Sequence, residues 1–182
     1  MIRLGYVTAT FSSVLLIGAQ SSLGPATPWL VWNATASTPT GIYELRSADR
    51  LNALQLVAVR PPEPIASFLA DGGFLPKNVL LLKHLLAFPG QTVCRTGAVV
   101  TVDGVDVGEA RDRDRLGRPL PNWSGCRTLR PDEVFLMNPT VQDSLDGRYF
   151  GPFPVTSIVA RAVPIWTDEE GDGRFVWRAA VD

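Results

Sequence analysis

The sequence predicts a mainly β domain that follows an N-terminal membrane anchor. Short apolar runs recur along the chain, and turn residues such as Gly, Pro and Asp separate them, as is typical of strands. The N-terminal part has a different pattern, because Arg3 is followed by no further charged residue until Glu44. A chain of 182 residues is long enough for one domain with a sizeable core, with little room for a second.

Composition and charge exclude several classes of protein. Hydrophobic residues make up 46% of the chain and charged residues 19%, which argues against disorder. The formal net charge is −1 and no basic stripe stands out, so we expect no nucleic-acid partner. The arginines within residues 111–118 alternate with Asp112 and Asp114. We interpret this stretch as a solvated loop, with a charged partner site as the alternative.

The cysteines and the histidine are too few for a Cys/His zinc site. The chain contains Cys94, Cys126 and His84 only, whereas such a site needs about four ligands. We therefore expect no metal, and no other cofactor. The two cysteines are a candidate disulfide if the domain is exported, and two separate thiols if it is cytosolic. The compartment decides between these alternatives, and the compartment depends on the N-terminus.

Residues 1–32 are predicted to be a signal-anchor with its juxtamembrane stretch. Residues 6–19 are mostly apolar, although Thr and Ser dilute them, and a spanning helix needs about 20 apolar residues. Trp29 and Trp32 stand where interfacial aromatic anchors are expected. We favour an uncleaved signal-anchor over a cleaved signal peptide or a buried core helix. Arg3 favours a cytoplasmic N-terminus, which would export everything after the anchor.

The remainder, residues 33–182, is predicted to be one β-rich domain. Residues 65–70 are expected to form a short helix that ends at two glycines. Asp103 and Gly104 mark the turn of a hairpin. A long loop is expected at residues 108–125, which lack apolar periodicity. The expected strands are residues 54–59, 79–87, 92–93, 99–107, 133–138 and 157–166.

The first segment that could support chemistry is residues 33–43, which leads into a strand. Ser37 precedes Pro39 and Gly41. Pro and Gly fix an irregular backbone that can hold a serine hydroxyl outward. The alternative is an ordinary linker.

The second segment, residues 81–90, places Lys83 within an otherwise apolar strand. Strand alternation puts Lys83 on the same face as Leu85, with His84 on the other face. Apolar surroundings disfavour the charged amine, so they lower the pKa of a lysine and leave a neutral amine that can accept a proton. The alternative is a lysine whose amine reaches solvent at a strand edge.

The third segment, residues 143–152, gathers a hydroxyl, a carboxylate and a guanidinium in a short turn. These groups belong to Ser144, Asp146 and Arg148. The alternative is a charged surface turn with a local Asp146–Arg148 pair, which would contribute less than about 1 kcal/mol if exposed.

Together, these ordered segments resemble the type I signal peptidase family, and more closely its TraF-type conjugal transfer branch. The block from Lys83 to Pro89-Gly90 and the block Asp146-Gly-Arg-Tyr-Phe-Gly-Pro are specific in combination. The region between Cys94 and Cys126 also resembles the TraF-type branch. The resemblance implies a β-fold of coiled antiparallel sheets behind an N-terminal transmembrane or signal-anchor helix.

The resemblance also implies a Ser–Lys catalytic dyad. Ser37 matches the nucleophile of the family and Lys83 its general base. Thr35 matches the position whose hydroxyl helps to form the oxyanion hole, and the backbone N–H of Ser37 would be the second donor.

Three further positions match supporting residues of the family. Ser144 matches the hydroxyl that orients the lysine amine, and Asp146 and Arg148 match the pair that braces the turn. His84 departs from the family pattern, which usually has Arg after the lysine. A Ser–His–Asp triad on His84 is a formal alternative that we disfavour.

The implied function is that of a membrane-bound serine endopeptidase of the bacterial inner membrane, with its catalytic domain in the periplasm. The resemblance implies a pilin precursor of a conjugal transfer system, of the type IV secretion kind, as substrate. It also implies other transfer proteins as partners, and leaves hydrolysis and cyclisation open. The alternatives are a general type I signal (leader) peptidase and a non-catalytic periplasmic component of the transfer apparatus.

Overall fold

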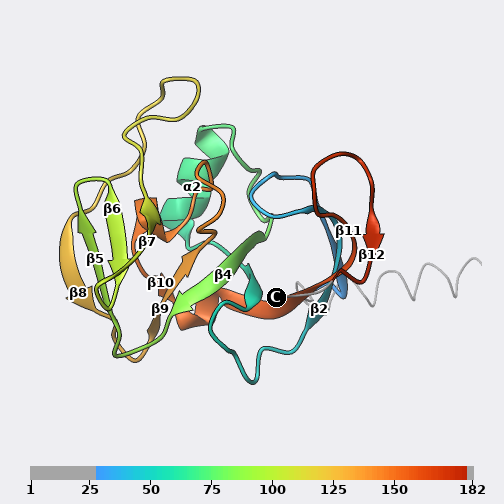
Figure 1. The fold of residues 1–182 in the computed structure, drawn as a ribbon, viewed down its shortest axis with the longest axis horizontal. Coiled ribbons are helices and arrows are strands. Elements are labelled where there is room, and N and C mark those ends of the chain that lie inside the picture. Colours follow the sequence, from blue (N-terminus) through green and yellow to red (C-terminus); the bar gives the residue numbers. More distant parts are fainter. Residues whose placement is uncertain (1–27, 180–182) are drawn as a thin grey trace, which may run out of the picture.

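The computed structural model describes residues 28–179, which form two antiparallel sheets with few helices (Figure 1). The large sheet has the order β1 (Leu30–Asn33), β2 (Thr40–Arg46), β11 (Ile158–Asp168), β3 (Leu56–Val59), β4 (Leu81–Ala87), β9 (Glu133–Met137) and β10 (Phe153–Pro154), with β12 (Val176–Trp177) beside β11. The small sheet has the order β7 (Val105–Glu109), β6 (Val99–Val102), β5 (Thr92–Thr96) and β8 (Gly125–Thr128). The prediction of a mainly β fold is confirmed.

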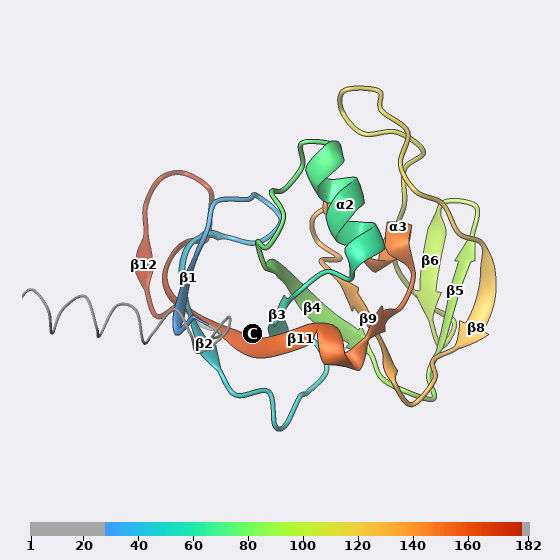
Figure 2. The same cartoon turned by 180° about the vertical axis from the view of Figure 1, so that it is seen from behind.

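The main core lies between the large sheet and helix α2 (Glu63–Asp71), which connects β3 to β4. Val57, Leu85 and Leu136 are fully buried on three neighbouring strands, and Leu69 of α2 packs into the same cluster. Figure 2 shows α2 standing over β3, β4 and β9. Because β4 is the central strand of this group, its alternate side chains are held in fixed positions.

Helix α2 begins two residues earlier than the predicted stretch 65–70 and ends at Asp71, one residue beyond it. A proline occupies its first turn, where the missing N–H costs nothing and the fixed φ favours a helix. The backbone N–H of Gly72 then bonds to the carbonyl of Phe68 and closes the last turn. The helix therefore lies where the sequence indicates.

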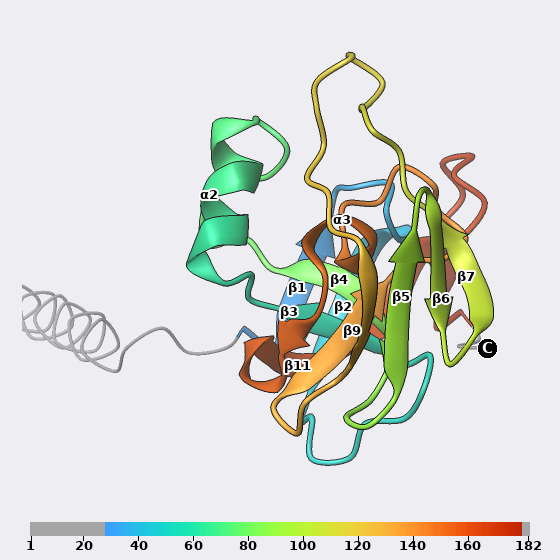
Figure 3. The same ribbon diagram turned by 90° about the vertical axis from the view of Figure 1, so that its left-hand side faces the viewer.

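The predicted hairpin is present as β6 and β7. Its turn residues Asp103 and Gly104 have φ values of 48° and 81°, as a type I′ turn requires. The connection from β7 to β8 is the predicted long loop, and it spans residues 110–124. It projects beyond the small sheet in Figure 3. Arg118 connects this loop to the turn that follows α2, since its guanidinium lies 3.9 Å from the ring centre of Phe74.

Strand β1 lies within the stretch expected to flank the membrane anchor. It pairs with β2 from Leu30 to Asn33, so the sheet begins before the expected boundary at residue 33. Trp32 lies on this strand, is 56% exposed and stacks on Phe175. The four-residue strand was missed because its pairing partner, not its own composition, stabilises it.

The predicted anchor run, residues 6–19, lies outside the described residues. Within residues 28–179, the helices are all too short or too polar to cross a membrane.

Candidate active site

Ser37 lies in the loop that joins β1 to β2, and the side chain of Asn33 organises this loop. Asn33 Nδ2 donates hydrogen bonds to the carbonyls of Thr38 (3.0 Å) and Pro39 (3.1 Å), among others. Its Oδ1 accepts from the backbone N–H of Thr35 at 3.1 Å and from Thr35 Oγ1 at 2.8 Å. One buried amide at the end of β1 therefore sets the course of the loop that presents Ser37.

Tyr43 of β2 tethers the far end of the same loop. It is 1% exposed, and its hydroxyl donates to the Pro39 carbonyl at 2.7 Å. Burial raises the pKa of Tyr43 above its ordinary value, so the phenol stays protonated and remains a donor.

The hydroxyls of Ser37 and Thr35 lie 3.2 Å apart. Thr35 has one hydroxyl proton, and it is donated to Asn33 Oδ1, which can only accept. The Ser37 hydroxyl therefore donates to Thr35 Oγ1 in this arrangement. Ser37 is half-buried, so its oxygen is reachable from solvent.

Lys83 is in the middle of β4, where it is only 2% exposed. Its amine donates to Ser144 Oγ at 2.8 Å. Burial lowers the pKa of Lys83 from 10.5 to about 8; Asp146 opposes this shift and Arg148 adds to it. The alternative of a lysine that reaches solvent is therefore wrong, because the surrounding strands and the Ser144 turn enclose the amine.

Asp146 and Arg148 form a buried ion pair beside Ser144 and are 0% and 1% exposed. Arg148 donates to the Asp146 carboxylate from Nε at 2.9 Å and from Nη2 at 3.0 Å. Asp146 also caps the short helix α3 (Gly147–Phe150) by accepting from the backbone N–H of Arg148. The alternative of an exposed surface turn is wrong, since this turn is enclosed by β9 and the small sheet.

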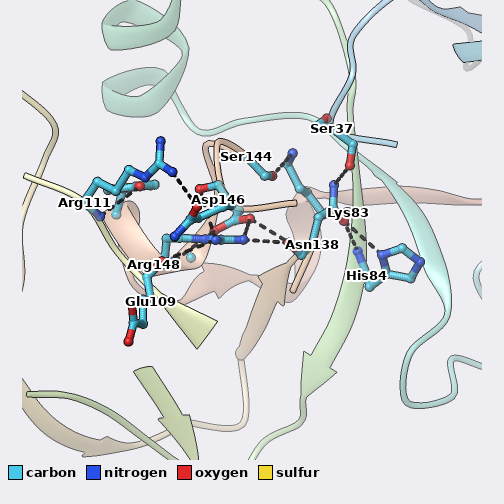
Figure 4. Close-up of polar contacts among 12 residues, drawn as sticks. Ser37, Lys83, His84, Glu109, Arg111, Asn138, Ser144, Asp146 and Arg148 are labelled. Carbon is cyan, nitrogen blue, oxygen red and sulfur yellow. Dashed lines mark hydrogen bonds and ion pairs between the residues drawn. The ribbon is translucent and has the colours of Figure 1, made fainter. Parts of the chain in front are cut away.

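The fold brings Thr35, Ser37 and Lys83 to the wall of one cavity of about 640 Å³. Figure 4 shows Ser37 and Lys83 beside Ser144. Among the described residues, Ser37 and Lys83 are not hydrogen-bonded to each other. The Ser37 hydroxyl bonds to Thr35, and the Lys83 amine bonds to Ser144. Such contacts often tighten only when substrate binds. Apolar residues in and after α2, Leu69 and Phe74, line one part of this cavity. Loop 110–124 lines another part with Arg111, Arg115 and Arg118.

A second cavity of about 770 Å³ lies on the other side of Thr35, which lines both cavities. Its wall includes Val31, Leu80 and Leu82 and is more apolar than that of the first cavity, but neither Ser37 nor Lys83 lines it.

The structure joins Cys94 and Cys126, the candidate disulfide, by an S–S bond between β5 and β8. His84 faces away from Ser37, and its ring Nδ1 lies 2.9 Å from Asn138 Oδ1. The Ser–His–Asp alternative is therefore not assembled among the described residues.

Two residues of the site were missed from the sequence, Asn33 and Asn138. Both are buried amides at the end of a strand. Asn138 directly follows the apolar strand β9, and a polar residue at that place was the only available signal. Their importance comes from partners far away in the sequence, which no local pattern reveals.

A family model described as signal peptidase, peptidase S26, matches residues 3–167. The chain belongs to this signal peptidase family. The family resemblance predicted from the three sequence segments is thereby confirmed.

Relatives with curated descriptions support the same branch. The chain is 34% identical over 178 residues to a probable conjugal transfer protein TraF of Sinorhizobium fredii, with 90% of this chain and 88% of that protein covered. It is 31% identical over 171 residues to a plasmid transfer protein TraF of Escherichia coli, with 89% and 94% covered. A solved signal peptidase I from Enterococcus faecalis is 17% identical with a TM-score of 0.39, and covers 63% of this chain and 98% of its own. A TM-score of this size does not establish a shared fold.

Proposed function

We propose that the chain is a serine endopeptidase of the signal peptidase type, with Ser37 as nucleophile and Lys83 as general base. The supporting observation is the state of Lys83, which is enclosed, bonded to Ser144, and on the wall of the cavity that Ser37 also lines. Burial brings its pKa to about 8, so a useful share of the amine is neutral near neutral pH.

The first step is attack of Ser37 Oγ on the scissile carbonyl while its proton passes to Lys83 Nζ. In the resting arrangement the Ser37 proton points to Thr35, so the hydroxyl must rotate towards the amine. Ser144 Oγ accepts a hydrogen bond from the amine and thereby keeps its lone pair aimed at one place.

The tetrahedral oxyanion is stabilised by the backbone N–H of Ser37 and the hydroxyl of Thr35. Each such donor contributes about 3–4 kcal/mol to transition-state stabilisation. Because Thr35 donates to Asn33 Oδ1 in the resting arrangement, its hydroxyl has to turn from Asn33 to the oxyanion.

Protonated Lys83 then gives its proton to the departing amine, and an acyl-enzyme on Ser37 remains. Water attacks this ester, again with Lys83 as base, and the products are a free acid and the regenerated hydroxyl. An amine of the same substrate chain can take the place of water, and the product is then a cyclic peptide.

For the substrate and setting, we propose a pilin precursor processed at the periplasmic face of a bacterial inner membrane during conjugal transfer. The support for conjugal transfer is the description of the relatives as conjugal or plasmid transfer proteins. The Cys94–Cys126 disulfide supports an exported domain. Exposed tryptophans in this part of the large sheet support a membrane surface nearby, because tryptophan favours the interface. They are Trp29 just before β1, Trp32 on β1, Trp166 on β11 and Trp177 on β12.

The test compares wild type, Ser37→Ala and Lys83→Ala in membranes that contain a pilin-type precursor, with the product read by intact mass. We expect processing by wild type only, with all three proteins folded. A product one water lighter than the hydrolysed one identifies cyclisation. Processing by Ser37→Ala at the wild-type rate would contradict the assignment. A wild type that processes general secretory precursors but no pilin would favour a general signal peptidase.

A further inference from the structure

Asn138 is enclosed between the two halves of the candidate dyad. It follows β9 directly and is 1% exposed. It lines neither of the two cavities described above, so substrate bound there would not touch it. Any influence of this residue on the reaction must therefore pass through its neighbours.

The side-chain amide of Asn138 connects the loop of Ser37 to the strand of Lys83. Its Nδ2 donates to the backbone carbonyl of Ser37 at 2.6 Å and to that of Leu82 at 3.1 Å. Its Oδ1 accepts from the backbone N–H of His84 at 3.1 Å. Leu82 and His84 flank Lys83 on β4, so one amide bonds to the backbone of both sequence neighbours of Lys83 and to the backbone of Ser37. Figure 4 labels Asn138, Ser37 and His84 in this arrangement.

The orientation of this amide is settled by its partners. Two carbonyls can only accept, so the NH₂ group must face Ser37 and Leu82, and the oxygen must face the N–H of His84. The ring Nδ1 of His84 lies 2.9 Å from that same oxygen, so Nδ1 carries a proton and donates. His84 therefore opposes a flip of the Asn138 amide.

The backbone of Asn138 reaches the third part of the site. Its N–H donates to Asp146 Oδ2 at 3.0 Å, and its carbonyl accepts from Arg148 Nη2 at 2.6 Å. The buried ion pair beside Ser144 is thus fixed to the same residue that holds Ser37 and β4.

We propose that Asn138, oriented by His84, is a positioning residue that sets the approach of the Ser37 hydroxyl to the Lys83 amine. The inference rests on the proposed Ser–Lys function. Ser37 and Asn138 are 101 residues apart in the sequence, and their bond fixes the loop against the central strand. Among residues 28–179, the other side-chain hydrogen bonds that hold the Ser37 loop come from Asn33 and Tyr43, and both of these bind it from its own strands.

Misplacement of reacting groups by about 1 Å can cost about 10²-fold in rate. We therefore expect Asn138→Ala to lower kcat by about 10- to 100-fold. The KM should stay within about threefold of wild type, because the cavity walls are unchanged. The pH midpoint of kcat/KM should also stay at its wild-type value, since Lys83 remains buried, bonded to Ser144 and close to Asp146.

The experiment measures kcat and KM of the full-length protein in membranes on a precursor peptide, normalised to the folded fraction. Glu133→Ala is the matched control, because Glu133 is a buried residue on the same β9, with bonds to Arg127 and the backbone of Arg130 at the far end. The control should lose stability without a fall in kcat per folded molecule. A merely structural role for Asn138 would give the two variants the same behaviour.

Asn138→Asp is the second variant, in case Asn138→Ala does not fold. It keeps the shape and the acceptor for His84, but it places an oxygen against the Ser37 and Leu82 carbonyls in place of a donor. We expect a fall in kcat at least as large as for Asn138→Ala. His84→Ala removes only the contact between the His84 ring and Asn138 Oδ1. We expect a smaller fall in kcat, of about two- to fivefold, because the Asn138 amide then loses only one of the contacts that orient it.

The inference is overturned if kcat per folded molecule in the Asn138 variants is within threefold of wild type, if KM rises while kcat is unchanged, or if the Glu133→Ala control falls equally. Ser37→Ala, measured alongside, separates this failure from failure of the proposed function. An inactive Ser37→Ala beside normal Asn138 variants removes only the positioning role, whereas an active Ser37→Ala removes the Ser–Lys function itself.

Discussion

The two halves of the candidate dyad are built in opposite ways. Lys83 and its supports Ser144, Asp146 and Arg148 are at most 2% exposed, and a central strand and a buried ion pair hold them. Ser37 is half-buried, on a short loop held by the side chains of Asn33 and Tyr43 from its own flanking strands and by the side chain of Asn138. The difference fits the proposed chemistry, because a general base needs dry surroundings to lose its proton, while a nucleophile must reach a substrate carbonyl.

The largest effect is expected on the side of the base, from Asp146→Asn. This change leaves the Arg148 guanidinium buried without its partner, which typically costs about 3–5 kcal/mol. Urea unfolding measures the loss. Arg174→Ala is the control, since the Arg174–Asp172 pair is at the surface and its loss should leave the unfolding midpoint unchanged. Equal midpoints for Asp146→Asn and wild type would show that the pair does not brace the base.

A second effect on this side is the pH dependence of stability. The folded state lowers the pKa of Lys83 from 10.5 to about 8, so it binds fewer protons than the unfolded state between these values. Wild-type stability should therefore rise from pH 8 to pH 10.5 relative to Lys83→Met, which lacks the group. A difference of about 2.5 pKa units corresponds to about 3 kcal/mol. Unfolding of both proteins at pH 7 and 10.5 gives this value, and a difference that stays constant would mean that the amine is not desolvated.

A smaller effect is expected on the side of the nucleophile, from Tyr43→Phe. The change removes one hydrogen bond to the Pro39 carbonyl, which still accepts from Asn33. We expect a loss of about 0.5–1.5 kcal/mol in unfolding free energy and a several-fold fall in kcat. A loss as large as that of Asp146→Asn would mean that the two halves are braced alike.

The strands were predictable where a single segment contains its own pattern. The apolar runs of β3, β4 and β9 and the Asp103-Gly104 turn were sufficient. Strand alternation put Lys83 on the same face as Leu85, and only the structure showed that the amine is buried. Strands β1 and β8 were not predicted, because they bury little apolar surface of their own and depend on β2 and β5 as partners.

The sequence pointed to Ser37 and Lys83, which the fold places on the wall of one cavity, but not to the residues that hold them. Ser37 and Lys83 belong to recognisable blocks, whereas the bonds of Asn138 join segments 101 and 56 residues away. Such a contact depends on how the sheet closes, and a single sequence contains no local signal of it. The Asn33 network was equally hidden, because it depends on the turn that residues 34–39 make.

The measurement that tests the central claim most directly is the pH profile of kcat/KM on a precursor peptide, for wild type and for His84→Ala. The pH profile of kcat/KM reports the pKa of the essential base in the free enzyme. We expect activity to rise with pH around a midpoint near 8 in both proteins, because burial sets the pKa of Lys83 to about 8. A midpoint near 6.5 that disappears in His84→Ala would contradict the claim and transfer the role of base to the histidine.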